Sequence, residues 1–591
     1  MFIALIIWCL AIYLRTDFAT ITKESAAEDG EKVWESKLEY AAYILGLVGN
    51  MCLAFLFFLV SRASPVLPLL GLTSESCIKY HIWVGHLVLT FFTAHGIFYI
   101  IFWGATDQLS EMTKWDKDWV SNVAGEIAGV CGLILWIATI PWIRRKFFEL
   151  FFYTHYLYIL FMVFFIFHVG ISFACTMLPG FYIFMVDRFL RFLQSRTQVH
   201  LLSARLLPCE TLELNFSKTH ELSYTPTSVM FINIPSISKL QWHPFTITSS
   251  SKLEPEKLSV VIKSEGTWSQ KLYKMLSTPS PIDHIGVSVE GPYGPPSTNY
   301  LRHDSLVMVS GGSGITPFIS IIRDLIYLSN TFKYKTPKTI LICAFKNTSS
   351  LSMLDLILPN SFTPFEISNL ELQIEAYITR DKEFKSNSQI ALQTIFFKLN
   401  PNDTPIYPIL GPNNWLWLGA IISSSFIIFL ILIGIITRYL IFPKKQHNTN
   451  YTFSFPLKAF LNMLVMCVSI AIVASVAVLW NKKSSAKKSI NQVQHLEGLS
   501  SSPTVSPSSI VYNNGGIDDV ELESLPSQSL AQATNVHYGE RPDLRKILFE
   551  IKGSSVGVLA SGPKKMRQEV AAICSSDLTE NLHFDSISFS W

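Results

Sequence analysis

Long apolar segments are the feature that most constrains the fold of this chain. Six lie in the first third of the sequence and two follow much later, near residues 1–14, 40–60, 81–103, 121–143, 151–173, 176–190, 415–441 and 456–480. A helix needs about 20 mostly apolar residues to cross a bilayer, so the longer segments predict membrane spans. Composition agrees, because 49% of the residues are hydrophobic and only 15% are charged. The lipid bilayer is therefore an expected partner.

Charge and cysteine content exclude several classes of protein. Basic and acidic residues are nearly balanced, 47 against 44, so a nucleic-acid partner is not expected. The nine cysteines contain no CxxC pair, which argues against a disulfide framework and against zinc or iron-sulfur sites. The first segment, MFIALIIWCLAIYL, has no basic start and is short for a span. We therefore expect the chain to begin within a transmembrane helix, with upstream segments missing.

The region between the two groups of apolar segments is typical of soluble domains. Short β-rich runs such as SVMFINI, LVMVSGG and TILICAF alternate with turn residues there. After the two apolar segments at 415–480, a Ser/Pro/Gln-rich stretch predicts a disordered linker. The sequence that follows it is again typical of a folded domain. Two spans return the chain to the side it left, so we predict one soluble domain interrupted by a membrane hairpin. Lys and Arg are concentrated in loop 144–150 and after residue 480, which favours a cytosolic position for the soluble part.

Histidines within the apolar segments indicate a functional site, because ionisable side chains are costly inside a membrane. His81 and His95 lie 14 residues apart in one segment, and His155 and His168 lie 13 apart in another. On a helix, these spacings separate the members of each pair by about 20 Å along the axis. Two levels of paired histidines are the arrangement that binds two haems axially. We predict the pairs His81/His155 on the cytosolic side and His95/His168 on the outer side.

Ideal helix geometry meets one difficulty here. His81 and His95 differ by only about 40° around the axis, but His155 and His168 differ by about 140°. A kink, a tilt or different haem orientations must therefore be assumed in the second helix. His86 points away from His81 and His95, and we interpret it as a structural residue.

Three motifs in the soluble region follow one another in a specific order. HPFT at 243–246 precedes GPYG at 291–294, and GGSGITP at 311–317 follows the strand-like run LVMVS. Glycines between a strand and a helix N-terminus allow close approach of the backbone to a nucleotide phosphate. The chain thus resembles the membrane ferric reductase and NADPH oxidase superfamily, whose soluble half is similar to ferredoxin-NADP reductase. Together with the hairpin and the ending HFDSISFSW, it resembles the plant ferric-chelate reductases (ferric reduction oxidases).

The resemblance implies a fold class: a membrane α-helical haem-binding bundle joined to a cytosolic ferredoxin-NADP-reductase-like module, with an antiparallel β-barrel FAD domain and an α/β nucleotide-binding domain. The implied domains are the haem domain at 1–192, the FAD domain at 196–300, the first part of the dinucleotide domain at 301–400, the hairpin at 410–481, the linker at 482–535 and the last part of the dinucleotide domain at 536–591.

The resemblance also implies cofactors and site residues. FAD, two haems of b type and NADPH or NADH are expected. The residues implied to bind the flavin or the dinucleotide are His243, Pro244, Phe245, Thr246, Gly266, Trp268, Ser269, Gly291, Pro292, Tyr293, Gly294, Gly311, Gly312, Ser313, Gly314, Ile315, Thr316, Pro317, Gly562, Pro563 and Trp591. Thr246 and Ser561 would lie near the reactive edges of the two rings. Ser561 stands where the family usually has cysteine, which we expect to slow hydride transfer without abolishing it.

The implied activity is transmembrane electron transfer from NAD(P)H through FAD and two haems to ferric chelates, with cupric complexes as a further acceptor. The ferrous product would pass to an iron transporter, and the plasma membrane is the expected location. Two alternatives stay open at this point: a superoxide-generating NADPH oxidase, and a transporter with a redox-sensing soluble domain. The sequence does not distinguish NADH from NADPH, and it does not predict the oligomeric state.

Overall fold

The computed structural model divides the chain into two units. The membrane unit comprises Met1–Leu190 and Trp415–Leu479, and the soluble unit comprises Arg191–Asn414 and Trp480–Trp591. The structure describes residues 2–62, 74–116, 121–278, 283–294, 299–332, 336–358, 370–381, 393–398, 400–410, 414–441, 453–499, 533–551, 553–576 and 581–587.

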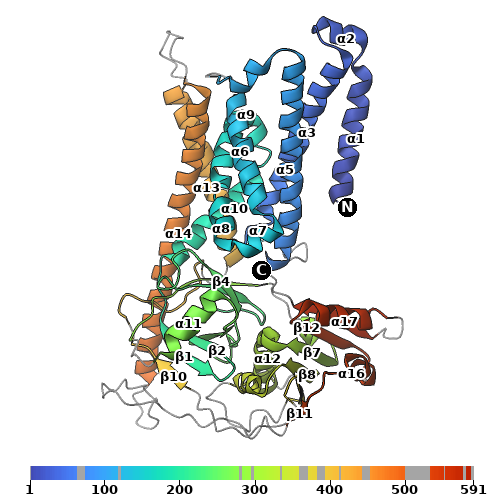
Figure 1. Cartoon of the computed structure of the whole chain (residues 1–591). Helices are drawn as coiled ribbons and strands as arrows, with labels where there is room; N and C mark the ends of the chain where they lie inside the picture. Colours follow the sequence, from blue (N-terminus) through green and yellow to red (C-terminus); the bar gives the residue numbers. More distant parts are fainter. Residues whose placement is uncertain are drawn as a thin grey trace. The chain divides into compact units, whose positions relative to one another are not determined.

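Helices form the membrane unit (Figure 1). They are α1 (Phe2–Thr20), α2 (Lys23–Glu28), α3 (Val33–Phe58), α5 (Ser74–Ala105), α6 (Asn122–Ala138), α7 (Pro141–Lys146), α8 (Phe148–His155), α9 (Tyr158–Ala174), α10 (Leu178–Ser195), α13 (Asn414–Ile436) and α14 (Phe455–Leu499), with the short turns η1 (Leu109–Thr113) and η6 (Thr437–Ile441). Within the described residues, five helical segments are long and apolar enough to cross a membrane: Val33–Phe58, Cys77–Ala105, Phe148–Ala174, Trp415–Ile441 and Phe455–Ser484.

Three of the predicted segments are not among these five. The segment predicted at 1–14 forms the first part of α1, which has 19 residues. The segment predicted at 121–143 forms α6, which is apolar but only 17 residues long. The segment predicted at 176–190 forms α10, which carries Asp187, Arg188 and Arg191 and is therefore amphipathic. Asp187 and Arg191 are buried and Arg188 is exposed, so two of the three charged side chains face protein.

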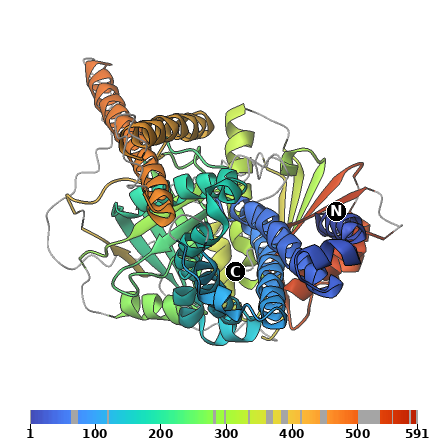
Figure 2. The same ribbon diagram turned by 90° about the horizontal axis from the view of Figure 1, so that it is seen from above.

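The second histidine helix has the break that the 13-residue spacing requires. Helix α8 ends at His155 and α9 begins at Tyr158, so the two histidines do not share one straight axis. A second irregularity follows His168, because Gly170 has φ 80° and ψ 165° inside α9. The first histidine helix, α5, is continuous and packs along α3 (Figure 2). The regular α-helix is thus interrupted between His155 and His168, as one of the alternatives from the sequence required.

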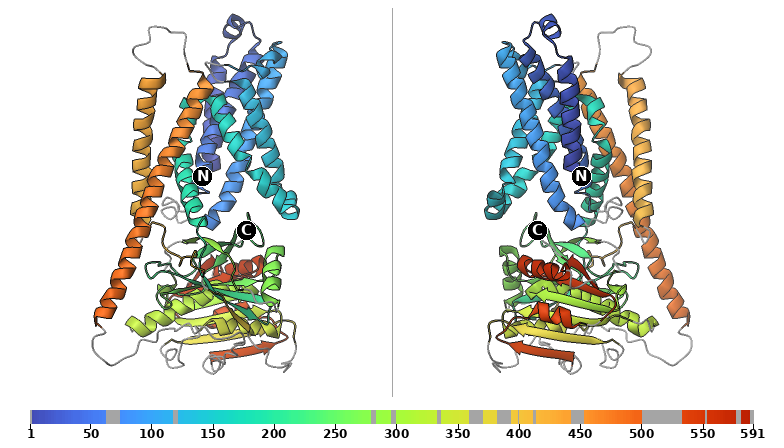
Figure 3. Two further views of the ribbon diagram at one scale, coloured as in Figure 1. Left: turned by 90° about the vertical axis from the view of Figure 1, so that its left-hand side faces the viewer. Right: turned by 90° about the vertical axis from the view of Figure 1, so that its right-hand side faces the viewer.

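The late hairpin packs against the rest of the membrane unit. Tyr182 on α10 donates a hydrogen bond to Ser425 Oγ on α13 at 2.8 Å, and its ring meets Phe426 edge-on. Helix α14 runs without a break to Leu499 (Figure 3), so it extends into the range 482–535 that we predicted as disordered. The apolar segment and the lysine-rich segment after it thus form one continuous helix.

Antiparallel strands form the first half of the soluble unit. One sheet has the order β10-β1-β2-β5 and the other has the order β4-β3-β6. Their strands are β1 (Leu201–Leu207), β2 (Thr211–Ser217), β3 (Val229–Asn233), β4 (His243–Thr246), β5 (Lys257–Lys263), β6 (Ser288–Tyr293) and β10 (Gln393–Phe396), and helix α11 (Thr267–Ser277) packs beside them. Strand β10 lies in the range 301–400 predicted for the dinucleotide domain, yet it pairs with β1.

A parallel sheet forms the second half, with the order β11-β9-β8-β7-β12-β13. Its elements are β7 (Ser305–Gly311), η3 (Gly312–Ile315), α12 (Thr316–Phe332), β8 (Lys338–Phe345), η4 (Thr348–Leu356), β9 (Leu372–Ile378), β11 (Thr534–Tyr538), α16 (Leu544–Glu550), β12 (Val556–Ser561), α17 (Lys564–Cys574) and β13 (Leu582–Ile587), with η2 (Asn299–Leu301) before them. Strands from both sides of the membrane hairpin therefore share one sheet. This is the arrangement that an interrupted domain requires.

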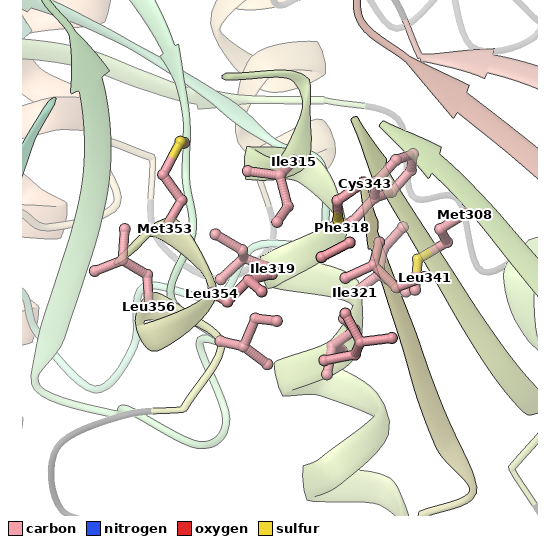
Figure 4. Packing of buried hydrophobic residues seen from close by; sticks show 14 of the residues in the cluster. Met308, Ile315, Phe318, Ile319, Ile321, Leu341, Cys343, Met353, Leu354 and Leu356 are labelled. Carbon is pink, nitrogen blue, oxygen red and sulfur yellow. The ribbon is translucent and has the colours of Figure 1, made fainter. Parts of the chain in front are cut away.

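The core beside this sheet holds α12 in place. Ile315, Phe318 and Ile319 pack against Leu341 and Cys343 of the sheet (Figure 4). All are fully buried, and burial of each large apolar side chain contributes about 1.5–3 kcal/mol. The N-terminus of α12 is consequently fixed at the end of β7.

Thr227 is in the left-handed backbone region, with φ 70°. A β-branched residue is strained there by about 1–2 kcal/mol. Its N–H donates to Ser320 Oγ on α12 at 3.1 Å, which holds this conformation.

Substitution of Thr227 by glycine is expected to stabilise the protein by roughly 0.5–1 kcal/mol, since relief of strain exceeds the added backbone entropy of glycine. Thr227→Ala keeps Cβ and should give no gain. Unfolding midpoints of the full chain, followed by tryptophan fluorescence, test this. A glycine variant less stable than the parent would contradict it.

Candidate functional site

The structure brings together both predicted histidine pairs. The inner pair, His81 and His155, has ring centroids 6.3 Å apart, and the outer pair, His95 and His168, has centroids 6.0 Å apart. The names inner and outer follow the predicted sidedness. Two imidazoles whose nitrogens each lie about 2 Å from one metal ion place their centroids about 6 Å apart. The residues present therefore fit an axially bound haem at each level.

Hydrogen bonds fix the outer pair. His95 Nδ1 lies 2.8 Å from the carbonyl oxygen of Ala42 on α3, and His168 Nδ1 lies 3.1 Å from that of Ser121 before α6. A carbonyl oxygen only accepts, so Nδ1 carries the proton and donates in both rings. Nε2 is then the free, ligating nitrogen. Within the described residues, the Nδ1 atoms of the inner pair are buried without a hydrogen-bond partner.

His86 has a different partner. Trp136 Nε1 on α6 donates to His86 Nδ1 at 2.8 Å, and the two rings lie in contact. This bond joins α5 to α6, which supports the interpretation of His86 as structural.

Three aromatic side chains lie together where the HPFT motif on β4 meets helix α11. His243 and Phe245 on β4 have ring centroids 4.5 and 6.0 Å from that of Trp268 on α11. Burial lowers the pKa of His243, so its imidazole is neutral at physiological pH. Trp268 is only 4% exposed, and its Nε1 has no partner among the residues that the structure describes. A buried donor without a partner is costly, so this surface fits a ligand that carries acceptors.

The start of α11 offers backbone donors. Gly266 is the N-cap residue, and the first N–H groups of a helix lack intrahelical partners. Ser269 Oγ accepts from the N–H groups of Glu265 and Gly266 at 3.1 and 3.0 Å. Ser269 therefore shapes this turn, while the helix N-terminus carries the attraction for a phosphate.

The GPYG motif is held by a residue that the sequence did not indicate. Gln194 Nε2 donates to the carbonyl oxygen of Gly291 at 2.8 Å, and the N–H of Gly291 donates to Gln194 Oε1 at 3.1 Å. Gly291 has φ 117°, a conformation that favours glycine. An isolated glutamine gives no sequence signal for such a bidentate contact.

The glycine loop after β7 meets the late turn directly. A Cβ on Gly314 would lie 2.5 Å from the carbonyl oxygen of Ser561, and one on Gly311 would lie 2.6 Å from Pro563 Cδ. Ser561 is the register partner of Ser310 at the carboxyl ends of neighbouring strands. Helix α12 begins at Thr316, as predicted for a phosphate-binding turn. The two motifs, about 250 residues apart, thus form one edge of the sheet.

One face of α12 anchors the dinucleotide half to the flavin half. Besides the Ser320 contact, Arg323 Nη1 donates to Glu254 Oε2 at 2.8 Å, and Nη2 donates to the carbonyl oxygen of Leu356 at 2.6 Å. Lys252 Nζ lies 5.7 Å from the centroid of the Tyr327 ring. Arg323 and Glu254 are both buried. These contacts were not predictable from the sequence, because each joins segments far apart in the chain.

The remaining predicted residues are placed as follows. Thr246 is buried at the end of β4, and Tyr293 packs edge-on against Phe231. The predicted Trp591 lies outside the described residues. The linker between α5 and α6 is described up to Asp116, where Lys114 pairs with Glu111.

Comparison with known proteins matches the same three regions. Family profiles match residues 45–166 (ferric reductase like transmembrane component), 196–297 (FAD-binding domain) and 303–427 (ferric reductase NAD binding domain). Ferric reduction oxidase 2 of Arabidopsis thaliana is 60% identical over 100% of this chain and 81% of its own length. Ferric reduction oxidase 3, mitochondrial, of the same plant is 58% identical over 100% and 79%. A superoxide-generating NADPH oxidase heavy chain of Dictyostelium discoideum is 32% identical over 33% and 31%.

Fold and site together define a multi-pass membrane oxidoreductase of the ferric reductase class, driven by NAD(P)H through FAD. The predicted fold class of apolar helices with FAD- and NAD-binding domains is confirmed. The chain belongs to the ferric reduction oxidase family.

Proposed function

We propose that this chain carries electrons from cytosolic NAD(P)H to ferric chelates on the opposite side of the membrane, by way of two haems. The observation that supports this most is the pair of histidine levels, His81/His155 and His95/His168, each with the ring separation of a bis-histidine metal site. When bound, the flavin accepts a hydride and releases electrons singly, and haem irons carry one electron each.

Different groups of residues in the chain would bind the haems, the flavin and the dinucleotide. The four histidines would hold the haem irons, His95 and His168 through Nε2, and the apolar helices around them would exclude water. His243, Phe245 and Trp268 offer an aromatic surface to the flavin ring, with the α11 N-terminus near its phosphates. Gly311, Gly314 and Gly562 let the glycine loop and the late turn pack closely together. Gly312, with nothing within 4 Å of an added Cβ, leaves the backbone open for the dinucleotide.

NADPH and NADH differ by one phosphate, for which the sheet edge offers basic residues. The N–H of Arg380 donates to the carbonyl oxygen of Lys346 at 3.1 Å, and both side chains are exposed after the carboxyl ends of β9 and β8. Ligands of open α/β sheets bind at this end of the strands. Arg380 is thus our candidate for recognition of a 2′-phosphate.

Ferric chelates, with cupric complexes as a second class, are the proposed acceptors, and ferrous iron for uptake is the product. Plasma membrane is the proposed location. Relatives bear the names mitochondrial and chloroplastic, so the compartment varies within the family.

A difference spectrum and an acceptor assay on the same membranes test the proposal. Dithionite-reduced minus oxidised membranes should show a b-type haem signal, and NAD(P)H should drive ferric-chelate reduction. The alternative oxidase activity would give superoxide at a rate that does not depend on added ferric chelate. That result would contradict the proposed ferric-chelate reduction. Absence of the haem signal would favour the transporter alternative.

A further inference from the structure

Two glycines hold the outer histidine pair in equivalent ways. We propose that Gly46 and Gly125 are positioning residues for the metal site between His95 and His168, and that they make this site chemically different from the inner one. The inference deepens the proposed function and rests on it, because it takes the histidine pairs to be haem ligands.

Each glycine is in direct contact with one imidazole. A Cβ on Gly46 would lie 2.8 Å from His95 Nδ1 and 3.0 Å from Cε1. A Cβ on Gly125 would lie 2.7 Å from His168 Nδ1 and 2.8 Å from Cε1. Both rings are half-buried and each is tied to a backbone carbonyl oxygen by its Nδ1, so neither can move away without loss of that hydrogen bond. Any larger residue at either position must therefore displace the ring.

The hydrogen bonds complete the same pattern twice. His95 bonds the carbonyl oxygen of Ala42, four residues before Gly46, and His168 bonds that of Ser121, four residues before Gly125. Residues four apart lie on the same face of a helix. Each ring thus lies over the bare glycine backbone and reaches the carbonyl one turn away. Helices α3 and α6, which carry no ligand, orient the ligands on α5 and α9.

The inner pair lacks this support. Neither His81 nor His155 is among the nearest atoms that a Cβ added to a described glycine would meet. His155 Nδ1 has no hydrogen-bond partner among the described residues, and the backbone of Leu56, which lies near His81, makes no hydrogen bond of normal geometry with Nδ1 of that ring. Donation from Nδ1 to an oxygen raises the basicity of a ligating imidazole. Hydrogen bonding to the axial ligands is one means by which a protein sets haem potential. More basic ligands favour the oxidised iron, so the outer site should have the lower potential of the two.

A redox titration of the purified full-length protein, followed by absorbance, measures this directly. The parent protein should show two components. Gly46→Ala and Gly125→Ala should each raise the potential of the lower component or remove it, and leave the higher one unchanged. The low-spin ferric EPR signal of that component should change with it, and the haem-to-flavin ratio should fall wherever the component is lost.

The chain supplies matched control variants. Gly104→Ala on α5 adds a Cβ whose nearest neighbour is Leu109 Cδ2 at 4.0 Å, an ordinary contact nine residues from His95, and it should leave both components unchanged. Gly49→Ala on α3 adds a Cβ 2.6 Å from Phe92 Cε1, which is a clash of equal severity away from histidine. That variant should lose stability without a selective change in the lower component.

The outcomes separate this inference from the proposed function. A parent protein without b-type haem would overturn both. Three results would overturn the inference alone. The potentials of both components could change equally in Gly46→Ala, they could change in Gly49→Ala as they do in Gly46→Ala, or they could stay unchanged in every variant. A selective change in the higher component would also contradict it.

Discussion

Replacement of His168 by alanine is expected to lower ferric-chelate reduction by more than about 100-fold, because loss of a ligand exceeds the effect of losing an outer hydrogen-bond partner. His168 faces His95 across 6.0 Å between centroids, and its orientation is fixed by Ser121. Among the described residues no group of three or more potential metal ligands is found, so this pair has no third ligand of that kind beside it. The outer metal site should therefore be lost.

The soluble half should keep working in this variant. The flavin and dinucleotide motifs lie in the other unit of the chain, so reduction of a soluble dye by NAD(P)H should stay within about twofold of the parent. Absorbance spectra should show about half of the parent's haem per flavin. His86→Ala is the matched control, because it removes a histidine of α5 that bonds Trp136 and should retain both haems. Unimpaired ferric reduction in His168→Ala would refute the assigned ligand.

Replacement of Arg323 by methionine is expected to destabilise the soluble unit by about 3–5 kcal/mol, since it leaves a buried carboxylate without its partner. Arg323 has a side chain only 2% exposed, and it donates to Glu254 and to two backbone carbonyl groups. Lys257 remains 3.3 Å from Glu254, but it is partly exposed and compensates weakly. The loss should appear in the denaturant midpoint of the full-length protein, read by tryptophan fluorescence.

Two further variants test the cause. Arg323→Met combined with Glu254→Gln removes both charges, and it should recover a substantial part of the lost stability. Lys114→Met removes an exposed i,i+3 pair with Glu111, and it should cost less than about 1 kcal/mol. An equal loss in Lys114→Met, or no recovery in the double variant, would show that burial of the ion pair is not the reason.

Much of this architecture was predictable, because its signals are local or periodic. The 14- and 13-residue histidine spacings predicted two levels of pairs, and the strand-glycine-helix order predicted the turn before α12. The 13-residue spacing called for a kink, a tilt or different haem orientations, but the position of the break after His155 was not predictable, since the sequence FYTHYLY contains neither proline nor glycine. A different reason explains why the sequence did not indicate the roles of Gln194, Arg323, Gly46 and Gly125. Their roles depend on neighbours brought close only by the tertiary fold.

The order of strands in the parallel sheet has a consequence for biosynthesis. Strands β7, β8 and β9 are made before α13 and α14, whereas β11, β12 and β13 are made after them. The turn at Ser561 and Gly562 therefore reaches its place beside Gly311 and Gly314 only after the chain has passed the bilayer twice. A molecule in which only one helix of the hairpin inserts leaves three strands on the wrong side of the membrane. Completion of the six-stranded parallel sheet therefore depends on insertion of both α13 and α14.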